Sequence, residues 1–217
     1  MNATFPRFFR LVVVASGLLL LTSGGASALE LKEGVQYKLL KPAQPTDVAP
    51  GKVEVVEVFW YACGHCYALE PMVESWNAKG RAPYVQLVRL PATWNELLKT
   101  HARVFYTAEI LGKLPQLNPL IFRAINVERK RLDTPESIEA FFVANGVSKA
   151  DFQKAFSSFA VESRLRRAED LNRRYRITAT PTFVVNGKYV TDVSMSGSED
   201  NLFEVLDELA ARDKQGG

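Results

Sequence analysis

Hydrophobic residues in the first half of the chain follow two spacings, one typical of strands and one typical of a helix. Residues 53–59 form a short, nearly continuous run of β-branched and aromatic side chains interrupted by two glutamates, which predicts a buried strand. Residues 84–90 alternate between apolar and polar positions and predict a second strand. Residues 64–79 are predicted to be a helix that Pro71 kinks, because an interior proline removes a backbone donor. Together they predict a βαβ unit with parallel strands.

Helical spacing dominates the middle of the chain. Glycine, proline and aspartate separate four predicted helices, at residues 95–111, 116–127, 135–145 and 148–156, which together look like a helical insertion. A longer polar helix, dense in arginine, is predicted at residues 158–175. We expect its charges to pair with nearby acids on a solvated face, in preference to forming a docking patch for an anion.

The remaining segments carry shorter elements. Residues 34–40 predict a short strand, which is followed by a loop with three prolines at residues 41–51. Residues 182–191 predict a β-hairpin, because Asn186-Gly187 supplies the two positive φ angles of a type I′ turn. An amphipathic helix is predicted at residues 199–212, and the last five residues are expected to fray.

Residues 1–28 have the layout of a secretory signal peptide. Arg7 and Arg10 form a basic start, residues 11–21 form an apolar core, and Ala26-Ser27-Ala28 matches an A-x-A cleavage site. An uncleaved membrane anchor is the alternative, but the apolar core is shorter than the roughly 20 residues that span a bilayer. We therefore expect export, with cleavage after Ala28.

The rest of the chain, residues 29–217, is long enough for one sizeable core or for a compact domain with an insertion. The sequence has 27 basic and 24 acidic residues, and removing the two arginines of the signal segment leaves 25 against 24, a net charge of about +1. Such a balance does not indicate a nucleic-acid partner. The chain has only 2 cysteines, spaced as one pair, which favours catalysis over a disulfide-stapled scaffold in an oxidising compartment.

Cys63 and Cys66 fall where the first predicted strand turns into the following helix. A thiol at a helix N-terminus faces unpaired backbone N–H groups and the positive end of the helix dipole, so its pKa is lowered. Cys63 is therefore the predicted nucleophile. Cys66, in the first helical turn, is near enough to form a disulfide with Cys63 or to attack a mixed disulfide on it. His65 can add positive charge or hydrogen bonds that favour the thiolate.

Two other uses of a Cys-x-x-Cys pair fit the sequence less well. A structural zinc site needs four ligands, and beyond the two cysteines the chain offers only His65 and His101. A purely structural disulfide would close a loop so short that it removes little chain entropy. We therefore expect neither a metal nor a cofactor.

Residues 59–71 resemble the active-site segment of the thioredoxin superfamily. The aromatic lead-in and the pattern Cys-x-His-Cys-Tyr are most similar to DsbA-type periplasmic thiol:disulfide oxidoreductases. That family commonly has Pro-His between its cysteines, whereas Gly64-His65 is the pair typical of protein disulfide isomerases. The resemblance implies an α/β thioredoxin fold with an inserted helical domain. It divides the chain into a thioredoxin-like domain, residues 29–94 and 158–217, and a helical insertion at residues 95–157.

Ala179-Thr180-Pro181 precedes the predicted hairpin and matches a second motif of the superfamily. Members of the superfamily have a cis proline there, packed against the cysteine pair. The resemblance implies that a cis bond turns the Thr180 backbone outward, where it pairs with an extended substrate. An ordinary trans proline at a strand start is the alternative. Gly64, Thr180 and Pro181 are accordingly the predicted substrate-binding residues.

Glu57 is an acid inside the predicted buried strand, where a charge is costly unless it titrates abnormally or finds a partner. Its position matches the buried acid that thioredoxin-like enzymes place beneath the second cysteine. We expect Glu57 to move a proton to or from Cys66, directly or through water. An exposed position or a structural pair with Arg89 is the alternative. Glu70 is expected on a helix surface, and His101 as a solvated or capping residue of the insertion.

The predicted activity is the introduction of disulfide bonds into exported proteins by dithiol–disulfide exchange. A low pKa makes Cys63 a good leaving group and stabilises the reduced form, so the protein is oxidising. With Gly64-His65 we expect a potential between about −180 and about −120 mV, the values of protein disulfide isomerase and DsbA.

The resemblance also implies partners and a location. It predicts a periplasmic monomer that acts on reduced or unfolded exported proteins and is reoxidised by a DsbB-type membrane quinone reductase. A disulfide isomerase or reductase, and a non-catalytic peptide-binding chaperone, are the alternative functions.

Overall fold

The computed structural model describes Met1 and residues 30–216, so the expected signal peptide and its cleavage site lie outside the described residues, apart from Met1. A mixed five-stranded sheet has the order β1-β5-β4-β2-β3. Its strands are β1 (Lys38–Leu39), β2 (Val53–Phe59), β3 (Val85–Pro91), β4 (Thr182–Val185) and β5 (Tyr189–Thr191). The predicted parallel pairing of β2 with β3 is confirmed, and the other neighbours are antiparallel.

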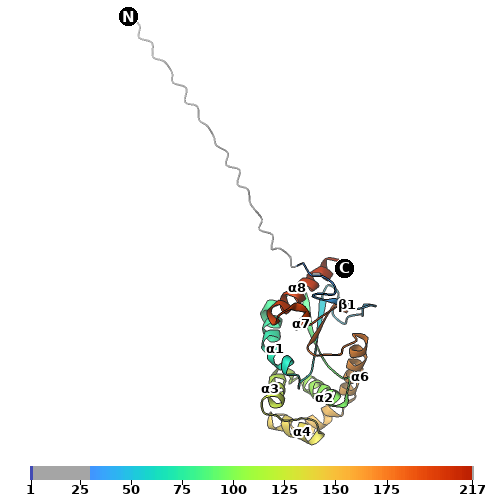
Figure 1. Ribbon diagram of the computed structural model, residues 1–217. Coiled ribbons are helices and arrows are strands. Elements are labelled where there is room, and N and C mark those ends of the chain that lie inside the picture. The colour runs from blue at the N-terminus through green and yellow to red at the C-terminus, as the bar shows by residue number, and fades with distance from the viewer. Residues whose placement is uncertain (2–29, 217) are drawn as a thin grey trace.

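Helices surround the sheet, and those of the insertion gather at the end of the molecule farthest from the C-terminus (Figure 1). They are α1 (Gly64–Ser75), which continues as the π-helix η1 (Trp76–Gly80), α2 (Glu96–Ile110), α3 (Leu114–Asn126), α4 (Pro135–Ala144), α5 (Lys149–Phe156), α6 (Phe159–Arg174), α7 (Val193–Ser196) and α8 (Glu199–Gly216). Side chains of Asn95, Thr134, Ser148 and Ser158 accept hydrogen bonds from the first turns of α2, α4, α5 and α6. These caps explain why the predicted helices begin where they do.

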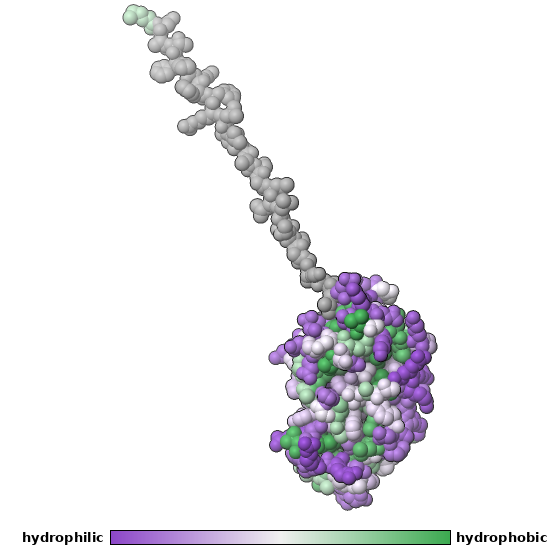
Figure 2. Space-filling view, in the orientation of Figure 1, coloured by the Kyte–Doolittle hydropathy of each residue, from purple (hydrophilic) through white to green (hydrophobic). Residues whose placement is uncertain are grey.

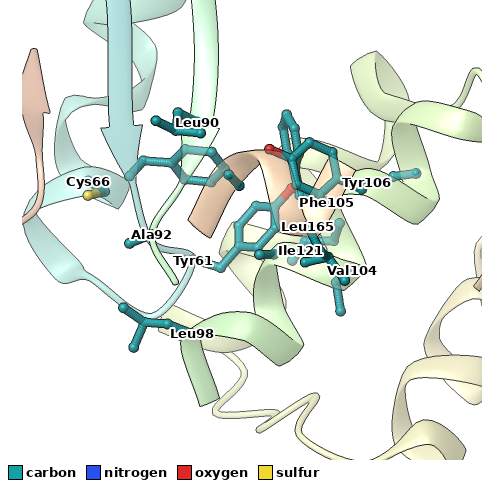
Figure 3. Packing of buried hydrophobic residues seen from close by; sticks show 14 of the residues in the cluster. Tyr61, Cys66, Leu90, Ala92, Leu98, Val104, Phe105, Tyr106, Ile121 and Leu165 are labelled. Carbon is teal, nitrogen blue, oxygen red and sulfur yellow. The ribbon is translucent and has the colours of Figure 1, made fainter. Parts of the chain in front are cut away.

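The sheet separates two hydrophobic cores. Because side chains alternate along a strand, Val53 and Val55 of β2 pack with α1 and α8, while Val56 and Val58 pack with the insertion. Tyr61, which follows β2, is buried in the second core, part of which Figure 3 shows. Its ring centroid lies 4.8 Å from that of Phe122 in α3. The insertion therefore packs directly against the segment that leads into the cysteine pair.

The surface agrees with the expectation of a solvated arginine-rich helix. Arginines of α6 pair with acids: Arg164 with Glu109, Arg167 with Asp47, and both Arg173 and Arg174 with Asp170. On the face shown in Figure 2, hydrophobic patches are scattered among polar side chains. Within the described part of the chain, no helix is both long and apolar enough to cross a bilayer.

The predicted bounds of the first strand and of the last helix were wrong. Of residues 34–40, only Lys38–Leu39 form a strand, so β1 is a short edge. Helix α8 continues to Gly216 instead of ending at residue 212. It continues because Asp213 is buried and pairs with the Lys188 ammonium at 2.5 Å, which ties this turn to the hairpin.

The hairpin turn has the predicted conformation, with φ of 46° at Asn186 and 63° at Gly187. A Cβ at Gly187 would stand 2.0 Å from the backbone carbonyl oxygen of Gln44 in the proline-containing loop. Glycine is therefore required here for two reasons, the left-handed backbone and the close approach of a second segment.

Gly187→Ala and Gly112→Ala separate these two reasons. Gly112 has a similar φ of +65°, but a Cβ there would meet no heavy atom within 4 Å. We expect Gly112→Ala to lower the free energy of unfolding by about 1 kcal/mol, and Gly187→Ala by about 3 kcal/mol because the loop must also move. Urea unfolding measures both changes. Equal losses in the two variants would show that the contact with Gln44 is unimportant.

Candidate active site

Cys63 is the N-cap residue of α1 and has an extended backbone, φ −84° and ψ 113°. Its N–H donates to the Trp60 carbonyl at 3.0 Å, and its Sγ accepts from the backbone N–H of Cys66 at 3.4 Å. The strand-to-helix turn predicted from the sequence thus places one sulfur over the helix N-terminus. Gly64 and His65 are exposed beside it.

The two sulfurs have opposite environments. Cys63 is partly exposed, and its pKa is lowered to about 5 by a hydrogen bond from the Cys66 side chain, aided by Thr180 and by backbone N–H groups of Cys66 and His65. Cys66 is fully buried, which raises its pKa. The hydrogen bond to Cys63 and the negative charges of Cys63 and Glu57 raise it further. At neutral pH the reduced pair therefore holds one proton, on Cys66.

The peptide bond between Thr180 and Pro181 is cis, which confirms the conformation implied by the resemblance. The Thr180 carbonyl oxygen lies 3.4 Å from Cys63 Sγ. This contact follows from the sheet, because β4 begins at Thr182 and pairs with Val58 near the end of β2. A segment more than one hundred residues away in sequence is thereby held against the reactive sulfur.

Glu57 faces the same side of the sheet as α1, and its side chain is completely buried. Neither carboxyl oxygen has a hydrogen-bond partner among the described residues. Burial raises the pKa of Glu57 to about 7, although the charge of Arg89 acts in the opposite direction. The expected buried position is confirmed, and the alternative of an exposed position is excluded.

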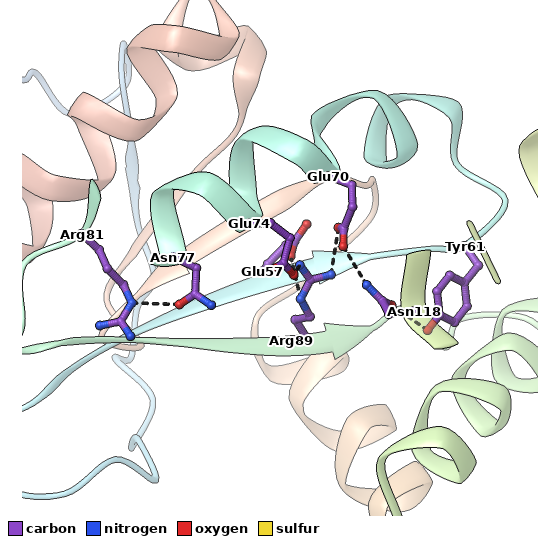
Figure 4. Close-up of polar contacts among 8 residues, drawn as sticks. All are labelled: Glu57, Tyr61, Glu70, Glu74, Asn77, Arg81, Arg89 and Asn118. Carbon is purple, nitrogen blue, oxygen red and sulfur yellow. Dashed lines mark hydrogen bonds and ion pairs between the residues drawn. The ribbon is translucent and has the colours of Figure 1, made fainter. Parts of the chain in front are cut away.

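Arg89 is shared among three carboxylates, as Figure 4 shows. Its shortest contacts go to Glu74 at 2.6 Å and Glu70 at 2.8 Å, whereas the distance from its Nε to Glu57 is 3.8 Å. Asn118 of α3 donates to Glu70 at 2.7 Å and accepts from the Tyr61 hydroxyl at 2.8 Å. The chain of contacts runs from the insertion to Glu57, whose charge raises the Cys66 pKa.

Two site-related expectations were wrong. Glu70 is not a surface charge, since it is 7% exposed and bound by Arg89 and Asn118. His101 is not solvated either, since it is 2% exposed and accepts a hydrogen bond from the Trp60 indole at 2.9 Å. In both cases the partner comes from a different element. Nothing in the local pattern around Asn118 or Trp60 signalled these contacts.

Within residues 30–216, the cysteine pair belongs to no larger cluster of metal-ligating side chains. Among the residues that the structure describes, no group of three or more histidine, cysteine, aspartate or glutamate side chains is placed to hold a metal ion.

Comparison with known proteins gives consistent matches. A family model described as the DSBA-like thioredoxin domain matches residues 84–209. The thiol:disulfide interchange protein DsbA of Pseudomonas aeruginosa is 37% identical over 189 residues, covering 87% of this chain and 89% of that protein. The protein of the same name from Bordetella parapertussis is 36% identical and covers 99% of each chain.

Solved structures agree. The crystal structure of Pseudomonas aeruginosa DsbA superposes with a TM-score of 0.80 at 37% identity, covering 84% of this chain and 94% of that one. The oxidoreductase DsbA from Xylella fastidiosa gives a TM-score of 0.78 at 26% identity, covering 85% and 98%. The predicted thioredoxin fold with a helical insertion is thus confirmed, and this chain belongs to the DsbA family of thiol:disulfide interchange proteins.

Proposed function

We propose that the protein donates a disulfide between Cys63 and Cys66 to reduced exported proteins, with Cys63 as the sulfur that substrates attack. The opposed environments of the two sulfurs carry this proposal. A low pKa stabilises the Cys63 thiolate of the reduced form, so the disulfide is readily given up. The exposure of Cys63 and the burial of Cys66 leave only one sulfur accessible to a substrate.

Each step follows from this asymmetry. A substrate thiolate attacks Cys63 Sγ, the bond between the two cysteines breaks, and its electron pair passes to the Cys66 sulfur, which takes up a proton. A second thiolate of the same substrate then attacks the substrate sulfur of the mixed disulfide. Cys63 leaves as a thiolate, the substrate gains a disulfide, and the pair ends reduced by two electrons.

Glu57 is the proposed source of the proton for Cys66. The charge of Glu57 raises the Cys66 pKa, and its own pKa of about 7 leaves Glu57 partly protonated at neutral pH. A structural pair with Arg89 accounts less well for Glu57, because Arg89 makes its short contacts with Glu70 and Glu74. Transfer proceeds directly or through a water molecule.

Gly64, Thr180 and Pro181 are the proposed substrate-binding residues, and His65 the proposed aid to the thiolate. Thr180 and Pro181 lie partly exposed beside Cys63, so an extended substrate can approach both the sulfur and the Thr180 backbone. A Cβ at Gly64 would meet no heavy atom within 4 Å, so the space above the pair is open.

Several expectations from the sequence stay predictions. They are cleavage after Ala28, location in the periplasm, a monomeric state, reoxidation by a DsbB-type quinone reductase, and the domain division at residues 29–94, 95–157 and 158–217. The placement of α2 to α5 between β3 and α6 supports the division. Family membership supports action on exported proteins.

The redox equilibrium with glutathione tests the proposed direction of the reaction. We expect a potential between about −180 and about −120 mV, because the stabilised Cys63 thiolate favours the reduced form. A value near −270 mV, that of thioredoxin, would contradict the proposal. Cys63→Ala is expected to abolish oxidation of a dithiol peptide, whereas Cys66→Ala, incubated with oxidised glutathione, is expected to keep glutathione as a mixed disulfide on Cys63, because no second cysteine resolves it.

The pH dependence of stability tests the state of Glu57. The folded protein favours its neutral form, so this stabilisation is complete below pH 4.5 and is lost as the pH rises through about 7. In the oxidised protein, where the cysteines do not titrate, we expect the free energy of unfolding of Glu57→Gln relative to the wild type to rise by about 3 kcal/mol between acid and pH 8.

Urea unfolding of the oxidised proteins across this pH range measures the difference. Glu96→Gln is the matched control, because the Glu96 side chain is 90% exposed and its replacement should follow the wild-type profile. A difference between Glu57→Gln and wild type that does not change with pH would show that Glu57 titrates normally.

A further inference from the structure

His101 connects the insertion to the lead-in of the cysteine pair. It lies in α2 and is 2% exposed. Its Nδ1 is 2.9 Å from the Trp60 indole nitrogen, and its Nε2 is 3.1 Å from the carbonyl oxygen of Arg131 in the loop between α3 and α4. Both ring nitrogens are therefore engaged, by two different segments.

These partners determine the protonation of the imidazole. The indole N–H is only a donor, so Nδ1 must accept and carries no proton. The Arg131 carbonyl is only an acceptor, so Nε2 carries the proton and donates it. His101 is thus neutral, which agrees with a pKa lowered by burial. Its ring also stacks on the indole, with centroids 6.1 Å apart.

Trp60 is the residue through which His101 reaches the redox centre. The Trp60 carbonyl accepts from the Cys63 N–H at 3.0 Å. The Trp60 backbone also acts on the second sulfur, since its N–H dipole works to lower the pKa of Cys66 against the larger effect of burial. One peptide segment therefore binds Cys63 and influences the charge state of Cys66. The Trp60 side chain is only partly buried, so packing alone does not hold it in place. Its indole hydrogen bond to His101 therefore restrains this segment.

We propose that His101 is a positioning residue for disulfide exchange, which acts by fixing Trp60 and thereby the backbone around both sulfurs. The inference rests on the proposed redox role of Cys63 and Cys66. It extends that role to a histidine with no contact to substrate or sulfur. The alternative is that His101 only stabilises the insertion through its two hydrogen bonds.

Two substitutions distinguish these roles because each retains one of the two bonds. In His101→Asn the amide oxygen takes the place of Nδ1 and can accept from Trp60, while the bond to Arg131 is lost. In His101→Gln the longer amide takes the place of Nε2 and can donate to Arg131, while the bond to Trp60 is lost. Each variant loses one buried hydrogen bond, so their urea midpoints are expected to fall by similar amounts.

The equilibrium constant with glutathione is the deciding measurement. We expect His101→Asn to stay within about twofold of the wild type, and His101→Gln to become less oxidising by about threefold or more, because a loosened turn donates less well to the Cys63 thiolate. Equal shifts in both variants, or no shift in either, would contradict the positioning role.

Trp60→Phe gives a second test, which leaves His101 itself unchanged. It removes the indole donor and is expected to shift the equilibrium constant as His101→Gln does. In the Trp60→Phe background, His101→Gln should then add no further shift, and an additive shift would contradict the proposal. A wild-type protein that does not oxidise dithiols would contradict the proposed function itself, whereas normal oxidation by all variants contradicts only the role of His101.

Discussion

The stabilisation of a negative charge on Cys63, beside a Cys66 that stays a buried thiol, is the interaction on which the rest of the structure depends. Two segments far apart in the sequence produce it. The first turn of α1 supplies backbone N–H groups and the hydrogen bond from the Cys66 side chain, and Thr180 of the cis-proline loop lowers the Cys63 pKa further. The stabilised thiolate lowers the free energy of the reduced protein relative to the disulfide form. The protein therefore passes its disulfide to substrates.

The helical insertion supports this site as well as covering the sheet. Tyr61 packs on Phe122 of α3, and the Tyr61 carbonyl accepts from Asn126 at 2.8 Å. The preceding residue, Trp60, is held by His101 of α2. Two successive residues before the cysteine pair are thus bound by two different helices of the insertion. The insertion is therefore part of the scaffold that sets the geometry of the sulfurs.

Local patterns predicted most of the fold and the centre of the site. The apolar run of β2, the helical spacing of the insertion and the Asn186-Gly187 turn depend on neighbours in sequence, and the structure agrees with them. The surroundings of Glu70 and His101 were mispredicted because their partners, Asn118 and Trp60, lie 48 and 41 residues away. Such contacts depend on how elements pack, which residue spacing does not encode.

Titration of the Cys63 thiolate tests this account most directly. Ultraviolet absorbance of the reduced protein, with the oxidised protein as a blank, reports the thiolate as the pH rises. Burial keeps Cys66 protonated, so the account predicts a single step at neutral and acid pH, with a midpoint at about 5. A midpoint near 8.5, the value of an ordinary thiol, would show that the protein does not stabilise the Cys63 charge and would contradict the account.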